Sequence, residues 1–81
     1  MGRITKARYI IEKEEPDRIV IADIGATQMS VTNDAENVVK ELHEKGILQG
    51  RRLFYYDSEG RLDELVHDGR GLFLSFAPGP R

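Results

Sequence analysis

The clearest pattern of apolar and polar positions in this chain is helical and covers about residues 33–45. Apolar side chains recur three or four residues apart, which places them on one helix face: Ala35, Val38, Val39 and Leu42. The opposite face carries glutamate–lysine pairs in the favourable i,i+4 order: Glu36–Lys40 and Glu41–Lys45. The pattern predicts one amphipathic helix whose apolar stripe faces a core.

Both ends of this helix carry sequence signals. Asn33 as the N-cap would put Glu36 at the third helical position, which is the spacing of a capping box, and Thr32 is the alternative cap. Gly46 suits the left-handed conformation that follows a helix, and Ile47 can then fold back on the last turn. We therefore expect a Schellman ending.

Before the helix, two runs rich in β-branched and aromatic residues predict strands over residues 4–13 and 18–24. The acidic segment Glu14–Asp17 separates them, and Pro16 in it pre-sets the backbone angle of a turn. These two strands are expected to form a β-hairpin. A loop over residues 25–30 then leads to the helix.

After the helix, three further runs predict a meander of strands: residues 51–57, 61–68 and 72–77. Asp57–Gly60 fits a type I turn with glycine at its fourth position, and Asp68–Gly71 fits a second tight turn. Pro78 should end the last strand and leave residues 78–81 as a frayed tail. The order of elements is ββαβββ.

This order defines the expected fold class: a single small α+β domain over residues 1–81, with an antiparallel-rich sheet and one helix packed on one face. A helix of about 14 residues is roughly 21 Å long and about 10 Å wide. Five strands spaced about 4.8 Å apart give a sheet roughly 20–24 Å wide. The helix should therefore cover only about half of one face.

Two of the expected strands are apolar on both faces, at Ile19–Ala22 and Leu72–Leu74. Successive strand residues point to opposite faces, so these side chains cannot all meet one helix. Either the sheet curls on itself, or another protein covers its second face. A homodimer is the simplest form of the second possibility.

Composition narrows the class of protein. The 12 basic and 14 acidic residues leave a net charge of −2, which gives no electrostatic reason for binding nucleic acid or acidic membranes. No apolar run reaches the roughly 20 residues of a membrane span. With no cysteine, neither a disulfide nor a thiolate metal site can reinforce so short a chain. We expect a soluble cytoplasmic protein, and oligomerisation is one usual way to stabilise a domain of this size.

Candidate chemistry in the chain is sparse. Ile19–Thr27 resembles the first phosphate loop of the sugar kinase, actin and heat-shock ATPase superfamily, where an apolar strand runs into an Asp-x-Gly-x-Thr turn. That superfamily needs two large lobes, so in 81 residues the motif favours a strand that leaves the sheet through a glycine turn. His43 and His67 are not spaced as metal ligands. No cofactor, metal site or catalytic activity is expected.

The remaining candidate is the segment at residues 50–56, on an expected strand, which interleaves basic and aromatic residues. Adjacent aromatic side chains favour an interface with another protein or a second copy of this chain. The alternative is a surface for RNA or single-stranded DNA, with bases stacked on Tyr55 and Tyr56, and with Arg61 or Arg70 as further contacts. The candidate interaction surface is Arg51, Arg52, Phe54, Tyr55, Tyr56 and Phe73.

Overall fold

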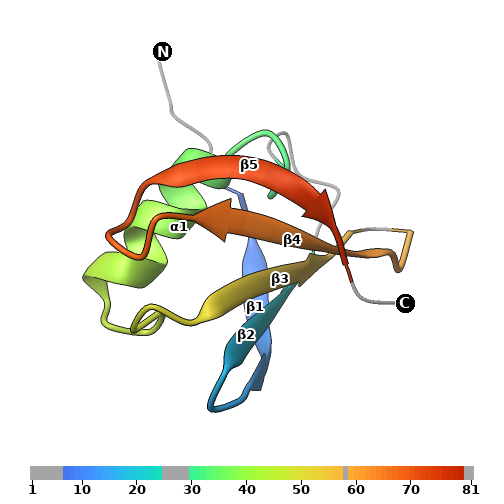
Figure 1. Cartoon of the computed structure of the whole chain (residues 1–81). Helices are drawn as coiled ribbons and strands as arrows, with labels where there is room; N and C mark the ends of the chain where they lie inside the picture. The colour runs from blue at the N-terminus through green and yellow to red at the C-terminus, as the bar shows by residue number, and fades with distance from the viewer. Residues whose placement is uncertain (1–6, 25–29, 58, 80–81) are drawn as a thin grey trace.

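The computed structural model describes residues 7–24, 30–57 and 59–79 (Figure 1). In this part of the chain one helix and five strands follow the order β1-β2-α1-β3-β4-β5. This confirms the predicted α+β class and element order. Their bounds are β1 Tyr9–Glu14, β2 Arg18–Asp23, α1 Ala35–Glu44, β3 Arg52–Tyr56, β4 Leu62–His67 and β5 Phe73–Pro78.

The strands lie side by side in sequence order and form one mixed sheet. β2 and β3 are parallel, because α1 carries the chain back to the end of the sheet where β2 began. The other three neighbouring pairs are antiparallel. The sheet is strongly twisted, and Figure 1 shows the β1–β2 hairpin turned away from the direction of β4 and β5. β1 and β5 are therefore the two edges.

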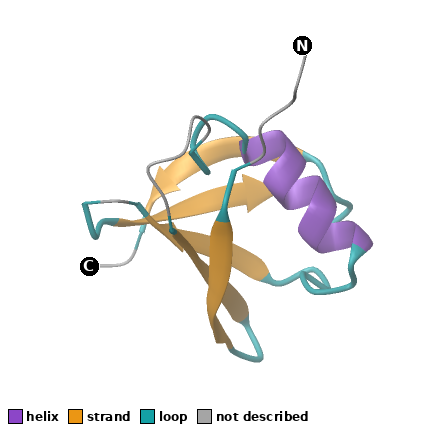
Figure 2. Cartoon of the chain, turned by 180° about the vertical axis from the view of Figure 1, so that it is seen from behind, coloured by secondary structure: helices purple, strands orange, loops and turns teal. Residues whose placement is uncertain are grey.

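The helix lies across one face of the sheet, as Figure 2 shows. Its buried residues are those of the predicted stripe: Ala35, Val38, Val39 and Leu42. They pack on alternate side chains of the three central strands, together with residues that flank the helix: Ile19, Ile21, Leu53, Tyr55, Leu65, Val31 and Leu48. The strand register aligns these side chains on the helix side, since Ile19 lies opposite Leu53 and Leu53 opposite Leu65.

The start of the helix differs from the prediction. Asp34 is the N-cap residue and its side chain makes no capping hydrogen bond, so neither Asn33 nor Thr32 caps the helix. The Asp34 carboxylate instead accepts hydrogen bonds from the Ala7 N–H (3.1 Å) and the Asn37 side-chain amide (2.7 Å). The capping signal is overridden by a contact with a segment far away in the sequence.

The end of the helix agrees with the prediction. Ile47 N–H donates to the Leu42 carbonyl and Gly46 N–H to the His43 carbonyl, both at 3.0 Å, which is the Schellman pattern. Gly46 has φ of 75°, in the left-handed region where a Cβ is unfavourable.

We expect Gly46→Ala to lower the free energy of unfolding by about 1 kcal/mol, because alanine is strained at this φ. A Cβ at Gly46 would meet no heavy atom within 4 Å, so the loss reflects backbone strain rather than a clash. Gly46→Asn should lose less, since asparagine tolerates the left-handed region better. Urea unfolding of the three proteins measures the order, and equal stability of the alanine variant would contradict the assignment.

The β3–β4 and β4–β5 turns are each fixed by an aspartate side chain that accepts backbone N–H groups. The Asp57 carboxylate accepts the N–H groups of Glu59 and Arg61, both at 2.9 Å. The Asp68 carboxylate accepts those of Arg70 (2.7 Å) and Leu72 (3.1 Å), and these bonds lower its pKa below the ordinary value. Aspartate at the first position thus fixes both turns; Ser58 lies outside the described residues.

The last strand extends beyond its predicted end. β5 includes Pro78, and the N–H of Gly79 donates to the Leu62 carbonyl at 3.1 Å, so neither residue belongs to a frayed tail. Proline is tolerated here because β5 is an edge strand. At the other end of the chain β1 begins at Tyr9, and the earlier residues 4–6 of the predicted strand lie outside the described part.

Candidate interaction surface

The six residues of the predicted interaction surface do not share one face. Side chains alternate along β3, so Arg52, Phe54 and Tyr56 lie on the sheet face away from the helix. Tyr55 points to the helix side and is buried in the core. Phe73 is partly buried and packs against the same core. The structure therefore brings together only part of the predicted set.

The middle of the face away from the helix is closed by charged side chains. The guanidinium groups of Arg18 and Arg52 lie 5.6 and 5.0 Å from the centre of the Phe54 ring. Arg52 also forms two hydrogen bonds to the Glu64 carboxylate, at 3.0 and 2.7 Å. Beneath these groups Phe54 is only 2% exposed, and Val20 on the same face is buried as well. The expectation that Ile19–Ala22 leaves a bare apolar surface is therefore not met.

Arg51 acts as a link between segments of the fold. Its side chain donates to the backbone carbonyls of Leu48, Ile47 and Glu15, and it pairs with the Glu14 carboxylate at 3.1 Å. These bonds tie the start of β3 to the helix end and to the β1–β2 turn. The Arg51 guanidinium is thus occupied by groups of its own chain.

The apolar side chains that remain exposed in the C-terminal part gather on and beside β5. Leu72 is 56% exposed, Leu74 54% and Phe76 43%. The Phe76 ring lies 4.8 Å from the centre of Phe73 and 6.2 Å from that of Tyr55, so its position is fixed by the core. We call Leu72, Phe73, Leu74 and Phe76 the β5 patch. Only Phe73 of these four was part of the predicted surface.

The two edges of the sheet differ in how they are protected. β1 carries Glu12, Lys13 and Glu14, and its pairing with β2 is interrupted between Ile11 and Lys13. Charges and bulges are the usual means of keeping an edge strand from pairing with another chain. β5 has an irregularity beside Val66 but no charged residue from Phe73 to Pro78. The β5 edge is the less protected of the two.

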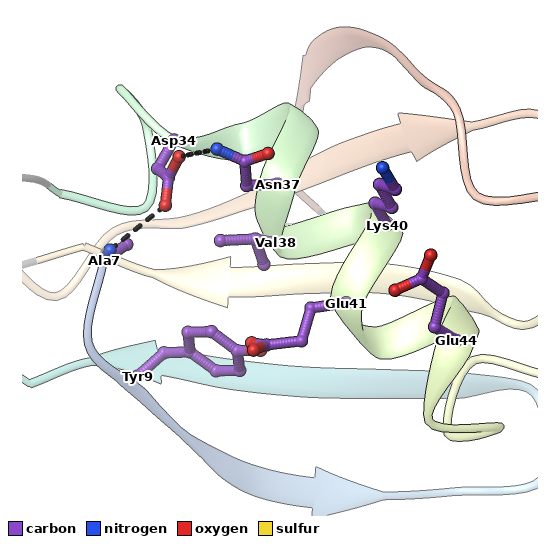
Figure 3. Close-up of a pocket in the computed structure, with 8 residues that line it drawn as sticks. All are labelled: Ala7, Tyr9, Asp34, Asn37, Val38, Lys40, Glu41 and Glu44. Atoms are coloured by element: carbon purple, nitrogen blue, oxygen red, sulfur yellow. Dashed lines mark hydrogen bonds between the residues drawn. The ribbon is translucent and has the colours of Figure 1, made fainter. Parts of the chain in front are cut away.

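A concave region of about 230 Å³ lies between β1 and α1 (Figure 3). Its lining residues are Ala7, Tyr9, Asp34, Asn37, Val38, Lys40, Glu41 and Glu44. The Tyr9 hydroxyl donates to the Glu41 carboxylate at 2.5 Å, and Figure 3 shows Asp34 held between Ala7 and Asn37. Glu41, expected on the outer face, therefore joins β1 to α1. The polar groups of this region therefore have a structural role: they join β1 and the residues before it to α1.

Burial, then the hydrogen bond to Glu41, raise the pKa of the Tyr9 hydroxyl well above its ordinary value. A raised pKa in the folded state means that Tyr9 stabilises the fold fully below its unfolded pKa of about 10 and loses this contribution as pH rises further. We expect the free energy of unfolding to fall more steeply between about pH 9 and pH 11 in the wild-type protein than in Tyr9→Phe. Denaturant titrations at both pH values test this. Parallel losses in the two proteins would contradict it, because Tyr55 and Tyr56 are common to both.

The two histidines have structural surroundings. His67 Nδ1 accepts the Gly69 N–H at 3.0 Å, which leaves Nε2 to donate to the Arg51 carbonyl at 2.7 Å. The His43 ring lies so close to Gly71 that a Cβ there would be 2.9 Å from it. Among the residues that the structure describes, no three histidine or carboxylate side chains gather as a metal site.

The phosphate-loop resemblance can be followed only in part. Asp23, at the end of β2, accepts the Val31 N–H at 3.2 Å, which fits a local structural role. Gly25, Ala26 and Thr27, which would form the turn, lie outside the described residues.

Comparison with models of protein families, with curated proteins and with solved structures gives no match to this chain. Within the described ranges, no helix is long and apolar enough to cross a membrane. The case for a function therefore depends on the surface itself.

Proposed function

We propose that this chain is a non-catalytic protein–protein interaction module that works as a homodimer through the β5 patch. The observation that carries the proposal is the exposure of Leu72, Leu74 and Phe76 on and beside an edge strand without charged residues. Exposed uncharged edges tend to pair with other chains, and natural monomers usually block them. The charged and interrupted β1 edge is an example of such blocking in the same sheet.

Burial of the patch would supply a substantial driving force. Burying a large apolar side chain completely is worth about 1.5–3 kcal/mol. The three exposed members of the patch are each about half exposed, so their burial would contribute on the order of 2–4 kcal/mol per chain. Each chain of a dimer contributes its own patch, and backbone pairing adds to this total.

The alternative, a surface for RNA or single-stranded DNA, has less support. Phosphate contacts need arginine groups that can turn to a ligand. Arg51 is engaged by three backbone carbonyls and Glu14, and Arg52 by Glu64. Tyr55 is buried on the helix side, so it cannot stack with a base without unpacking the core.

Sedimentation equilibrium of the purified chain at micromolar concentration tests the proposal. We expect a mass close to twice the 9.2 kDa of one chain, falling toward one chain on dilution. A 9.2 kDa monomer over the whole range would contradict it. A fluorescent oligonucleotide included in parallel should remain unbound. Binding that weakens steeply between about 50 and 200 mM salt would favour the alternative instead.

A further inference from the structure

We infer that the partner of the β5 edge is the β5 edge of a second copy of this chain, paired antiparallel about a two-fold axis at Phe76. The two five-stranded sheets would then join into one continuous sheet. This inference rests on the proposed function and names its partner and geometry. It is carried by three features: the backbone groups at the edge, the absence of charge along it, and the contrast with β1.

The backbone of β5 presents specific groups to the open edge. Gly79 N–H donates to Leu62 of β4, and the groups of successive residues in a strand alternate in direction. Pro78 and Phe76 therefore direct their backbone groups away from β4, consistent with Leu65 as the partner opposite Phe76. At these two positions the edge offers the N–H and C=O of Phe76 and the C=O of Pro78, because proline has no N–H.

This set of groups disfavours a register shifted toward Pro78. With the axis at Phe76, the N–H and C=O of Phe76 in each copy bond the C=O and N–H of Phe76 in the other. A shift that places Phe76 opposite Pro78 leaves each Phe76 carbonyl facing a residue without a donor. The pairing centred on Phe76 places Pro78 opposite Leu74, so its unpaired carbonyls lie at the two ends, and it keeps the reciprocal Phe76 pair at the centre, which the shifted pairing lacks.

The side chains of the edge are compatible with a second copy of themselves. From Phe73 to Pro78 no residue is charged, so antiparallel pairing brings no like charges together. Phe76, already in contact with Phe73 and Tyr55, would meet the ring of Phe76 in the second copy. Ser75 would lie opposite Ala77, and both face away from the helix, since they lie opposite Val66 and Glu64 in β4.

The charged residues of β1 disfavour a head-to-tail pairing of β5 with β1. β1 would set Glu12, Lys13 and Glu14 beside the apolar edge of β5, across an irregular stretch of backbone. Such a heterologous contact also propagates without closing unless its rotation forms a ring. Pairing of β5 with β5 closes after two chains.

Cysteine variants test the pairing, because the native chain contains no cysteine. Ser75→Cys and Ala77→Cys chains are mixed, allowed to exchange and oxidised mildly. In the inferred register these positions form a non-hydrogen-bonded pair with Cα atoms about 4.5 Å apart, within the range for a disulfide. Mass spectrometry should show a proportion of the mixed 75–77 disulfide well above that expected from random pairing of the two variants. Circular dichroism confirms that both variants fold, and Lys13→Cys on β1 is the control.

Each other outcome overturns the inference in a distinguishable way. A dominant 77–77 or 75–75 disulfide would mean a different register, and a 13–75 disulfide would mean head-to-tail pairing. A dimer in sedimentation that forms none of these disulfides would place the interface elsewhere and leave the proposed function intact. A chain that stays monomeric in sedimentation but binds an added foreign strand at β5 would contradict both the inferred pairing and the proposed homodimer.

Discussion

Leu42→Ala should be among the most destabilising single substitutions in this chain, with a loss of about 2–5 kcal/mol in the free energy of unfolding. Leu42 is 1% exposed and packs between the helix and the central strands, so its removal leaves a cavity that rigid neighbours on both sides can fill only in part. Small domains have about 5–15 kcal/mol of total stability, and the loss is a large share of it. Urea unfolding monitored by circular dichroism measures the change.

Glu44→Ala is the matched control, because Glu44 belongs to the same helix and is exposed. We expect it to change stability by less than about 0.5 kcal/mol. Glu41 is unsuitable for this comparison, since it accepts the Tyr9 hydroxyl. Similar small effects for Leu42→Ala and Glu44→Ala would mean that the helix does not pack as described.

The second large effect should come from Leu74→Lys, which we expect to weaken self-association at least about a hundredfold, or roughly 2.7 kcal/mol. Leu74 is 54% exposed in the single chain, so lysine there should cost the monomer little. In a paired β5 edge the same ammonium group would be desolvated beside apolar side chains, which is how natural proteins block edges. Sedimentation across a dilution series gives the dissociation constant.

Ile10→Lys provides the control for this variant. Ile10 is 48% exposed and lies on β1, the opposite edge, so the inferred dimer should form with unchanged affinity. If both variants dissociate, the effect is one of general surface charge. If neither does, the interface is not at β5.

Most of the local structure follows from short-range signals in the sequence. The helix stripe, the glycine ending at Gly46 and the aspartate turns at Asp57 and Asp68 depend on residues a few positions apart. The N-cap could not be predicted in this way, because the Asp34 carboxylate bonds Ala7, which is distant in sequence. Local propensity cannot report such a contact.

The candidate surface was harder to predict, for two physical reasons. The exposure of Phe76 depends on β5 being an edge, and strand order is not written in the pattern of any one strand. The role of Arg51 depends on carbonyls of Glu15 and Ile47, which only the folded chain brings together. The separation of Phe54 from Tyr55 does follow from strand alternation, since neighbouring residues point to opposite faces.

The face away from the helix shows how charged residues can close an apolar surface. A count of apolar positions treats Arg18 and Arg52 as solvent-facing, and so predicts that Phe54 and Val20 need a partner. Arginine can instead lay its stem and planar guanidinium over an aromatic ring while keeping its charge paired. Here Glu64 supplies that pairing for Arg52. Exposed apolar side chains remain at both edges of the sheet, and at β5 no charged residue of the strand accompanies them.

Amide hydrogen exchange resolved at Phe76, measured at high and low protein concentration, gives a direct test of β5–β5 pairing. Its N–H points away from β4, so in a single chain it has no strand partner and should exchange fast. Pairing with a second β5 edge predicts strong protection of this amide at high concentration and loss of the protection on dilution. Fast exchange of the Phe76 amide at every concentration would contradict the account.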